Sequence, residues 1–305
     1  MAGLLLAALA SFGEADPAQA RARPTGLLVP EKGALFGAHV QYGILNLGAQ
    51  VAVERLETQI GRRLDIDHYY TSWKSPFPGW REAWDISSGR IPFISWAKTS
   101  TSAVNSGKYD AMIRARAVGL KALGKTVFLE WFWEMDGARN RSYAKSPASF
   151  ISAWKRTHKI FEKERVDNVA WVWCPNASGF LTGEAPKWYP GDDYVDWICA
   201  DGYNWAPGRS DDDWRSFVSI FQPFYDWAST RSKPLLVGEY GVQERGRGEK
   251  AQWFEEARAA LKDNFPNILG IVYFNADLLY DWRVNTSKAS LEAFRGMGLD
   301  RYFSP

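Results

Sequence analysis

The feature that most constrains the fold is a succession of eight short apolar segments separated by longer stretches. Continuous apolar runs of this length are typical of parallel strands that are covered on both faces. The runs lie at residues 34–40, 64–72, 91–96, 126–134, 168–174, 194–203, 234–240 and 268–275. Eight such strands with helical crossovers predict a single α/β domain, a (β/α)8 TIM barrel, which typically takes about 250 residues.

Several of the intervening stretches have helical periodicity, most clearly residues 109–125, 146–164 and 249–263. The second begins with Ser146 and Pro147, which favour an N-cap and a first helical position. His158 lies on its apolar stripe, so we expect a packed histidine rather than a catalytic one. The main alternative is a doubly wound open sheet. That fold favours a G-x-G-x-x-G motif after the first strand, and none follows here.

The first 22 residues resemble a secretory leader, although no basic residue precedes the apolar run Leu4 to Leu9. We therefore expect residues 1–22 to be a signal peptide or a disordered leader, residues 33–305 to form the catalytic domain, and the protein to be secreted. The net charge of +2 does not indicate a nucleic-acid partner. No apolar run approaches the roughly 18 residues of a membrane span, and we expect a monomer.

The two cysteines, Cys174 and Cys199, both fall in apolar runs. An oxidising compartment would permit a disulfide between them, but buried free thiols are at least as consistent with the pattern.

Two glutamates end apolar runs: Glu134 closes "TVFLEWFWE" and Glu239 closes "PLLVGE". They are 105 residues apart (239 minus 134), about three βα units, so they would face each other across a barrel mouth. Such a pair fits glycoside hydrolysis, in which one carboxyl donates a proton and the other attacks or activates water. Trp131 and Trp133 would raise the pKa of Glu134 by desolvation. The alternative is that one or both glutamates pair with an arginine for stability.

Other chemistries have less support. The chain has no H-E-x-x-H, C-x-x-C or G-x-S-x-G motif, which argues against a zinc site and a serine nucleophile. Asp277 and Asp281 lack the rest of a calcium loop. We expect neither a metal nor a cofactor.

Five segments occur in an order that resembles glycoside hydrolase family 26: "FLEWFWEMDG", "FISAWKRTHKIFEKERVDNVAWVWCPN", "WYPGDDYVDWICADGYNW", "KPLLVGEYG" and "IVYFNADLLYDWRVN". That family is best known for endo-β-1,4-mannanases and belongs to a clan of retaining (β/α)8 glycosidases. The resemblance implies that Glu134 is the acid/base and Glu239 the nucleophile. It also implies that Tyr203 hydrogen-bonds the nucleophile and that Trp205 is a wall of the sugar site.

The chain departs from the family pattern around the expected acid/base. Mannanases of the family read like R-x-x-H-E-M-N-G, whereas here Glu130, Trp133 and Asp136 stand at the Arg, His and Asn positions. These changes affect sugar recognition more than hydrolysis. The residues expected to bind substrate lie at strand ends: His39, Trp96, Trp133, Asp136, Tyr203, Trp205 and Phe274. Trp96 could instead belong to the core.

The leading hypothesis is a secreted, retaining β-glycoside hydrolase, resembling an endo-β-1,4-mannanase, that acts on a β-linked polysaccharide. A β-1,3-xylanase or a mixed-linkage β-glucanase of the same family is the alternative. A hypothesis of a different class is a weakly catalytic barrel that binds polysaccharide through its aromatic residues, which make up 15% of the chain.

Overall fold

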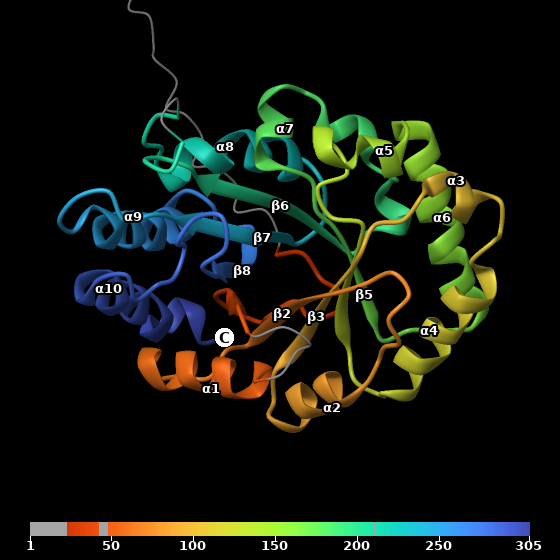
Figure 1. Ribbon diagram of the computed structural model, residues 1–305, viewed down its shortest axis with the longest axis horizontal. Helices are drawn as coiled ribbons and strands as arrows, with labels where there is room; N and C mark the ends of the chain where they lie inside the picture. The colour runs from red at the N-terminus through yellow and green to blue at the C-terminus, as the bar shows by residue number, and fades with distance from the viewer. Residues whose placement is uncertain (1–22, 43–47, 210–211) are drawn as a thin grey trace, which may run out of the picture.

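A computed structural model describes residues 23–42, 48–209 and 212–305, so the expected leader at residues 1–22 lies outside the described part of the chain. Its centre is a closed barrel of eight parallel strands in sequence order (Figure 1). The strands are β1 (Leu35–Val40), β2 (Ile66–Thr71), β3 (Ile91–Trp96), β4 (Val127–Trp131), β5 (Val169–Trp173), β6 (Trp197–Asn204), β7 (Leu235–Val242) and β8 (Ile268–Asn275). The predicted (β/α)8 barrel is confirmed.

Helices surround the barrel (Figure 1). They are α1 (Ala49–Ile60), α2 (Trp80–Ser87), α3 (Thr101–Asn105), α4 (Asp110–Ala122), α5 (Arg141–Ala144), α6 (Pro147–Lys163), α7 (Ala177–Leu181), α8 (Phe217–Ala228), α9 (Glu249–Asp263) and α10 (Lys288–Leu299), with 3₁₀ turns at Ala138–Asn140, Ala185–Trp188, Asp192–Tyr194 and Arg301–Phe303. The three helices predicted from periodicity are α4, α6 and α9. Ser146 caps α6 by accepting a hydrogen bond from Ser149 N at 3.2 Å. In the described part of the chain, no helix combines the length and apolar character needed to cross a bilayer.

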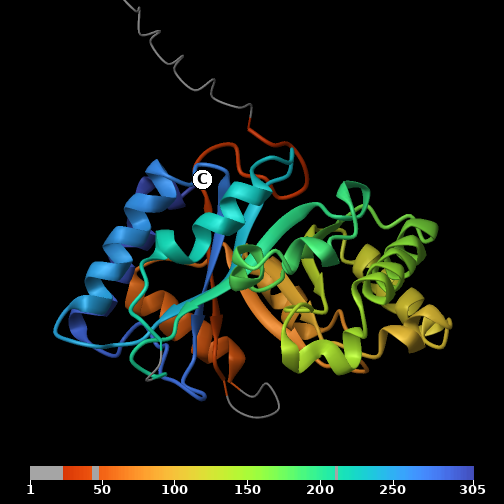
Figure 2. The same cartoon turned by 90° about the horizontal axis from the view of Figure 1, so that it is seen from above.

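Side chains of each strand alternate between the barrel interior and the helical layer. Those that face the lower part of the interior are apolar. Phe93, Phe128 and Trp197 fill this interior and are fully buried. The segment before β1 covers the N-terminal ends of the strands, where Leu27 O accepts a hydrogen bond from Trp197 Nε1 at 2.8 Å. Figure 2 shows this segment beside the C-terminus.

The helical layer is rich in tryptophan, and Trp96 belongs to it. Trp96 lies on the outward side of β3, is fully buried and stacks on Trp73 with ring centroids 4.2 Å apart. Its Nε1 donates a hydrogen bond to Trp73 O at 3.0 Å. Trp96 is therefore a core residue and not the sugar platform that the sequence suggested. His158, as expected, packs on α6 between the rings of Trp171 and Tyr194.

Cys174 and Cys199 are bonded to each other, with their sulfur atoms 2.03 Å apart. The sequence had left free thiols as an equal alternative. The bond joins the residue that follows β5 to β6, where continuous strand pairing is short and involves Val172 with Trp197 and Trp173 with Ile198. The disulfide thus reinforces a seam that has few backbone hydrogen bonds.

A group of buried charges, here called the outer charge cluster, lies between β2 and the helices that cover it. Arg81 binds Asp67 with both nitrogens of its fork, the shortest contact being 2.9 Å, and Arg90 binds Glu57 at 2.6 Å. Asp85 is also buried, with Oδ1 3.8 Å from Arg90 Nη1. Paired arginines make burial of these carboxylates tolerable.

Candidate active site

The C-terminal ends of the strands carry a group of four carboxyls, here called the mouth carboxyls: Glu130, Glu134, Asp201 and Glu239. The C-terminal face of a (β/α)8 barrel is where its loops form active sites. Glu130, Asp201 and Glu239 come from strands β4, β6 and β7, and Glu134 comes from the turn that follows β4.

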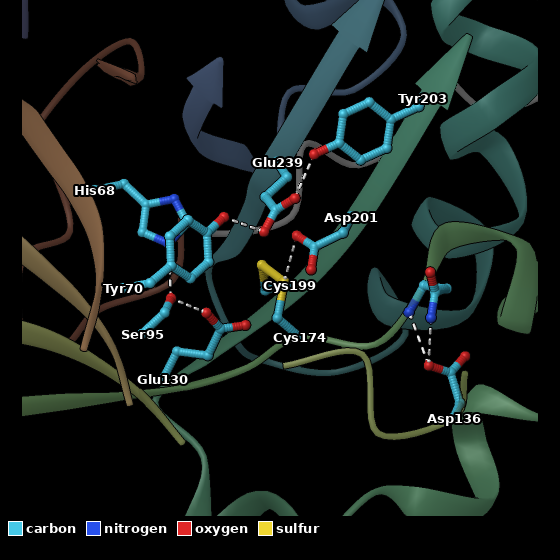
Figure 3. The surroundings of a disulfide bond; sticks show 11 residues. His68, Tyr70, Ser95, Glu130, Asp136, Cys174, Cys199, Asp201, Tyr203 and Glu239 are labelled. Atoms are coloured by element: carbon cyan, nitrogen blue, oxygen red, sulfur yellow. Dashed lines mark hydrogen bonds between the residues drawn. A yellow bond between two sulfur atoms is a disulfide. The ribbon is translucent and has the colours of Figure 1, made fainter. Parts of the chain in front are cut away.

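Glu239 is held by two phenols. Tyr70 on β2 donates a hydrogen bond to Oε1, and Tyr203 on β6 donates one to Oε2 (Figure 3). Burial raises the pKa of Glu239, while these two hydrogen bonds and the charge of Lys98 act to lower it. The hydrogen bond expected for Tyr203 is present. Tyr70 was not selected from the sequence, although its alternation with Ile66 and His68 along β2 would have pointed it into the barrel.

Gly238 brings β7 close to the disulfide. A Cβ atom at this position would lie 2.5 Å from Cys199 Sγ and 2.8 Å from Cys174 Sγ, which is closer than real contacts allow. The glycine immediately before Glu239 therefore allows β7 to pass close to the sulfur atoms.

Glu134 is presented by a turn rather than by a strand. β4 ends at Trp131, and the chain then passes through left-handed backbone at Phe132 (φ 64°) and Glu134 (φ 50°). Non-glycine residues populate this region sparsely, and such conformations concentrate at functional sites. The turn is anchored because Glu134 N donates to Cys174 O at 2.9 Å, and Asn140 Nδ2 donates to Glu134 O at 2.7 Å.

The surroundings of Glu134 favour its protonated form. Burial raises its pKa to about 7, and the negative charges of Glu239 and Asp136 add to this effect. The described residues include no arginine or lysine that forms an ion pair with Glu134 or Glu239. The structure therefore does not support the alternative that these glutamates pair with an arginine for stability. A carboxyl with this pKa can serve as a proton donor near neutral pH.

The two tryptophans beside Glu134 have different positions. Trp131 is fully buried in the helical layer, where its ring lies parallel to that of Phe150, so it does not flank the carboxyl as expected. Trp133 is half-buried and contacts the ring of Tyr70, with centroids 5.1 Å apart. Trp133 therefore belongs to the wall of the mouth.

A chain of polar side chains lies beneath the catalytic candidates. His68 Nε2 is 2.6 Å from Ser95 Oγ, and this hydroxyl donates to Glu130 Oε2 (Figure 3). Glu130 Oε1 has no hydrogen-bond partner among the described residues, and burial raises the pKa of Glu130 well above its usual range. Sequence reasoning singled out Glu130 only as a departure from the family pattern.

Asp201 is the fourth mouth carboxyl. It is 3% exposed, and its Oδ1 lies 3.1 Å from Cys174 Sγ. Burial, followed by the charge of Glu239, raises its pKa well above the ordinary value. Within the described ranges, Asp201 and the two cysteines form the one group with the spacing of metal ligands, but sulfur atoms bonded to each other are not thiolate ligands.

Asp136 braces the site rather than facing the opening. Its Oδ1 accepts hydrogen bonds from Asn176 N at 3.0 Å and from Asn176 Nδ2 at 2.9 Å, and the residue is 8% exposed (Figure 3). Asp136 therefore ties the turn after β4 to the loop after β5 and is placed as a structural residue rather than as the sugar contact expected from the sequence.

His39 and Phe274 lie side by side at the ends of β1 and β8, with ring centroids 4.9 Å apart and an interplanar angle of 24°. His39 Nδ1 is 3.0 Å from His68 O, and burial lowers the pKa of His39 to about 4. His39 is therefore neutral at physiological pH. Phe274 is half-buried and also contacts the edge of Tyr203.

Trp205 is half-buried and contacts Tyr203, with ring centroids 5.0 Å apart. The Arg209 guanidinium carbon lies 3.6 Å from the centroid of the Trp205 ring, and the buried Trp282 packs against Trp205 with ring centroids 5.3 Å apart. Trp205 thus remains positioned as a side wall, while Trp282 is buried.

The comparisons with known proteins agree with this geometry. The family model described as glycosyl hydrolase family 26 matches residues 126–273. The chain is 31% identical to endoglucanase H of Acetivibrio thermocellus over 82% of this chain and 30% of the relative. It is 28% identical to a beta-1,3-xylanase of an Alcaligenes species, over 59% of this chain and 41% of that protein. The chain thus spans less than half the length of either relative.

Solved structures agree on the fold. A GH26 beta-mannanase from Bacteroides ovatus superposes with a TM-score of 0.66, at 16% identity, over 89% of this chain and 90% of that one. The barrel, the sequence match over β4 to β8 and the position of the paired glutamates lead to one conclusion. The chain belongs to glycosyl hydrolase family 26.

Proposed function

We propose that the protein is a secreted, retaining β-glycoside hydrolase in which Glu134 is the acid/base and Glu239 the nucleophile. The observation that carries this proposal is the difference between the two carboxyls. Glu134 accepts no side-chain hydrogen bond from the described residues and has a pKa of about 7, whereas Glu239 accepts one from each of two phenols. Environments that separate the protonation of two nearby carboxyls identify the proton donor and the anion.

The reaction would take two steps. Glu134 donates its proton to the leaving oxygen while the Glu239 carboxylate attacks the anomeric carbon, so the glycosidic C–O bond breaks and an ester bond to Glu239 forms. Glu134 then removes a proton from water, the water oxygen attacks the same carbon, and Glu239 is released. Tyr70 and Tyr203 stabilise the charge that Glu239 carries before and after the reaction.

We place a β-linked glucan ahead of mannan as the substrate, which reverses the order suggested by the resemblance alone. The relative that aligns over 82% of the chain is named an endoglucanase, whereas the match to a mannan endo-1,4-beta-mannosidase of Caldalkalibacillus mannanilyticus covers 31% of the chain. Trp133, where mannanases carry histidine, supports a changed sugar contact. The disulfide supports an oxidising compartment and hence secretion.

Release of reducing ends from mixed-linkage β-glucan, galactomannan, glucomannan and β-1,3-xylan tests the proposal. Glu239→Ala and Glu134→Ala should each lower kcat by roughly 10⁴-fold or more, as for the loss of a nucleophile or its proton-transfer partner in other hydrolases. Glu256→Gln, on the exposed side of α9, is the matched control. Nuclear magnetic resonance of the first product should show a retained anomeric configuration.

The pH profile supplies a second test. Because Glu134 must be protonated to donate, activity should fall as pH rises through about 7. Turnover that survives in Glu239→Ala, or an inverted product, would contradict the assigned roles. Affinity for polysaccharide without turnover in the unaltered protein would instead favour a binding barrel.

A further inference from the structure

Lys98 is a cation at the barrel mouth that the proposed reaction does not use. It lies two residues beyond the end of β3, and its Nζ is 4.8 Å from the ring centroid of Trp133. Trp133 immediately precedes Glu134 and contacts Tyr70, which hydrogen-bonds Glu239. The Lys98 ammonium is therefore held beside both catalytic candidates.

The Lys98 ammonium has no acceptor among residues 23–42, 48–209 and 212–305. No carboxylate or carbonyl oxygen there lies within hydrogen-bonding or ion-pair distance of its Nζ, although the residue is half-buried. By contrast, the buried Lys250 donates to Trp282 O and Arg283 O, at 3.4 and 2.7 Å. An aromatic face attracts an ammonium group but satisfies none of its three N–H donors.

The charge of Lys98 acts on both glutamates. It lowers the pKa of Glu134 and that of Glu239, in opposition to the effect of burial. A donor this close to the reacting groups loses water when a sugar unit fills the mouth. It must then find an acceptor on the ligand, because an unsatisfied charged donor is costly.

We propose that Lys98 is a specificity-determining residue whose ammonium group donates hydrogen bonds to hydroxyl oxygens of the sugar unit adjoining the cleaved bond. The inference rests on the proposed function, since it needs a glycan in the mouth. It deepens that function because a site built to hydrogen-bond a hydroxyl discriminates strongly against sugars that lack it or place it differently. Trp133 contributes by holding the lysine stem in position, and the face beneath Lys98 is not free to stack on sugar.

Calorimetric titration tests this proposal with hexasaccharides of mixed-linkage β-glucan and of β-1,4-mannan as probes. The parent protein carries Glu134→Gln, which mimics the protonated acid and prevents consumption of the ligand. Lys98→Met keeps an unbranched apolar stem of four heavy atoms but removes the donors, and Lys98→Arg keeps the charge. Lys155→Met is the matched control, because Lys155 is half-buried with its Nζ 4.7 Å from the ring centroid of Tyr194 on the outer face.

Lys98→Met should weaken Kd by about tenfold or more, as expected for loss of a charged hydrogen bond. Lys98→Arg should stay within about threefold, and Lys155→Met should not differ from the parent. In hydrolysis assays, Lys98→Met should also move the acid limb of kcat/KM to higher pH, because the pKa of Glu239 rises without the cation. Parent-like affinity in Lys98→Met would overturn this inference but leave the proposed function intact. A parent that binds neither probe would count against the proposed function, and the role of Lys98 would fall with it.

Discussion

The outer charge cluster and the mouth carboxyls are both groups of buried acids, but they are stabilised in different ways. In the outer cluster, Arg81 and Arg90 supply positive charge to Asp67 and Glu57. The remaining acid, Asp85, is buried beside Asp67, and burial raises its pKa to about 9, so it is neutral at physiological pH. Every ionised carboxylate named in this cluster therefore has an arginine.

At the mouth, hydroxyl groups replace the arginines. Tyr70, Tyr203 and Ser95 donate the side-chain hydrogen bonds to Glu239 and Glu130. Hydroxyls stabilise a carboxylate less than a bidentate arginine does, so the protons of the mouth acids stay available. The difference teaches that a buried acid held by a fixed cation serves the fold, whereas one held by neutral donors can exchange its proton.

Removal of an outer arginine should have the largest effect on stability. Arg81→Met leaves Asp67 buried and unpaired, which should cost about 4 kcal/mol and lower Tm by roughly 10 °C. Scanning calorimetry measures this, with the exposed Arg139→Met as control. Adding Asp67→Asn to Arg81→Met should recover part of the loss. A Tm unchanged by Arg81→Met would mean that Asp67 is already neutral. The outer charge cluster would then not differ from the mouth carboxyls in depending on arginine charge.

The inner side of the barrel should owe its stability to the disulfide rather than to charge. Cys174→Ala with Cys199→Ala opens a loop whose ends are 25 residues apart, and should cost about 3 kcal/mol. Urea unfolding measures the change. Dithiothreitol added to the unfolded protein should reproduce it, whereas the double variant should be insensitive to dithiothreitol. Equal stability of the unaltered protein and the double variant would show that strand pairing alone holds β5 to β6.

Loss of one phenol should act on catalysis more than on stability. Tyr203→Phe removes a hydrogen bond that favours ionised Glu239, so kcat/KM at pH 6 should fall by about 10- to 100-fold. The pKa of Glu239 rises without this donor, so the acid limb should move to higher pH. Tyr189→Phe, which removes a phenol bound to Asp192 on the outside, is the control. An unshifted acid limb would show that Tyr203 does not set the pKa of Glu239.

Glu130→Gln should have the smallest effect. If Glu130 is neutral, as its burial implies, glutamine preserves the charge, and kcat should stay within about threefold with an unchanged alkaline limb. An ionised Glu130 would give a different result. Its replacement would lower the pKa of Glu134, and the alkaline limb would move to lower pH. The pH–rate profiles of the two proteins distinguish these cases.

The fold and the glutamate pair were predictable because they depend on patterns that a single chain displays. Eight apolar runs predicted the strands, and the positions of Glu134 and Glu239 at run ends predicted the candidate site. The orientation of Trp96 and Trp131 could also have been inferred, because Ser95 and Glu130 are their polar neighbours. If these polar side chains face the interior, the tryptophans must face the helices.

Other features depend on contacts that no local pattern displays. The end of β4 at Trp131 follows from left-handed backbone at two residues with no glycine to mark it. The bond between Cys174 and Cys199 depends on how closely β5 approaches β6. The pairing of Asp136 with Asn176 depends on the loops that follow β4 and β5, which are 40 residues apart.

The position of the chain ends has a practical consequence. Ala34 N donates to Tyr302 O at 2.7 Å, so both ends of the described chain meet at the floor of the barrel, opposite the mouth (Figure 2). A linker attached to either end of the described chain would lie on the side of the barrel opposite the mouth carboxyls. Coupled to a bead or a scaffold through these ends, the protein would keep the mouth carboxyls directed away from the point of attachment.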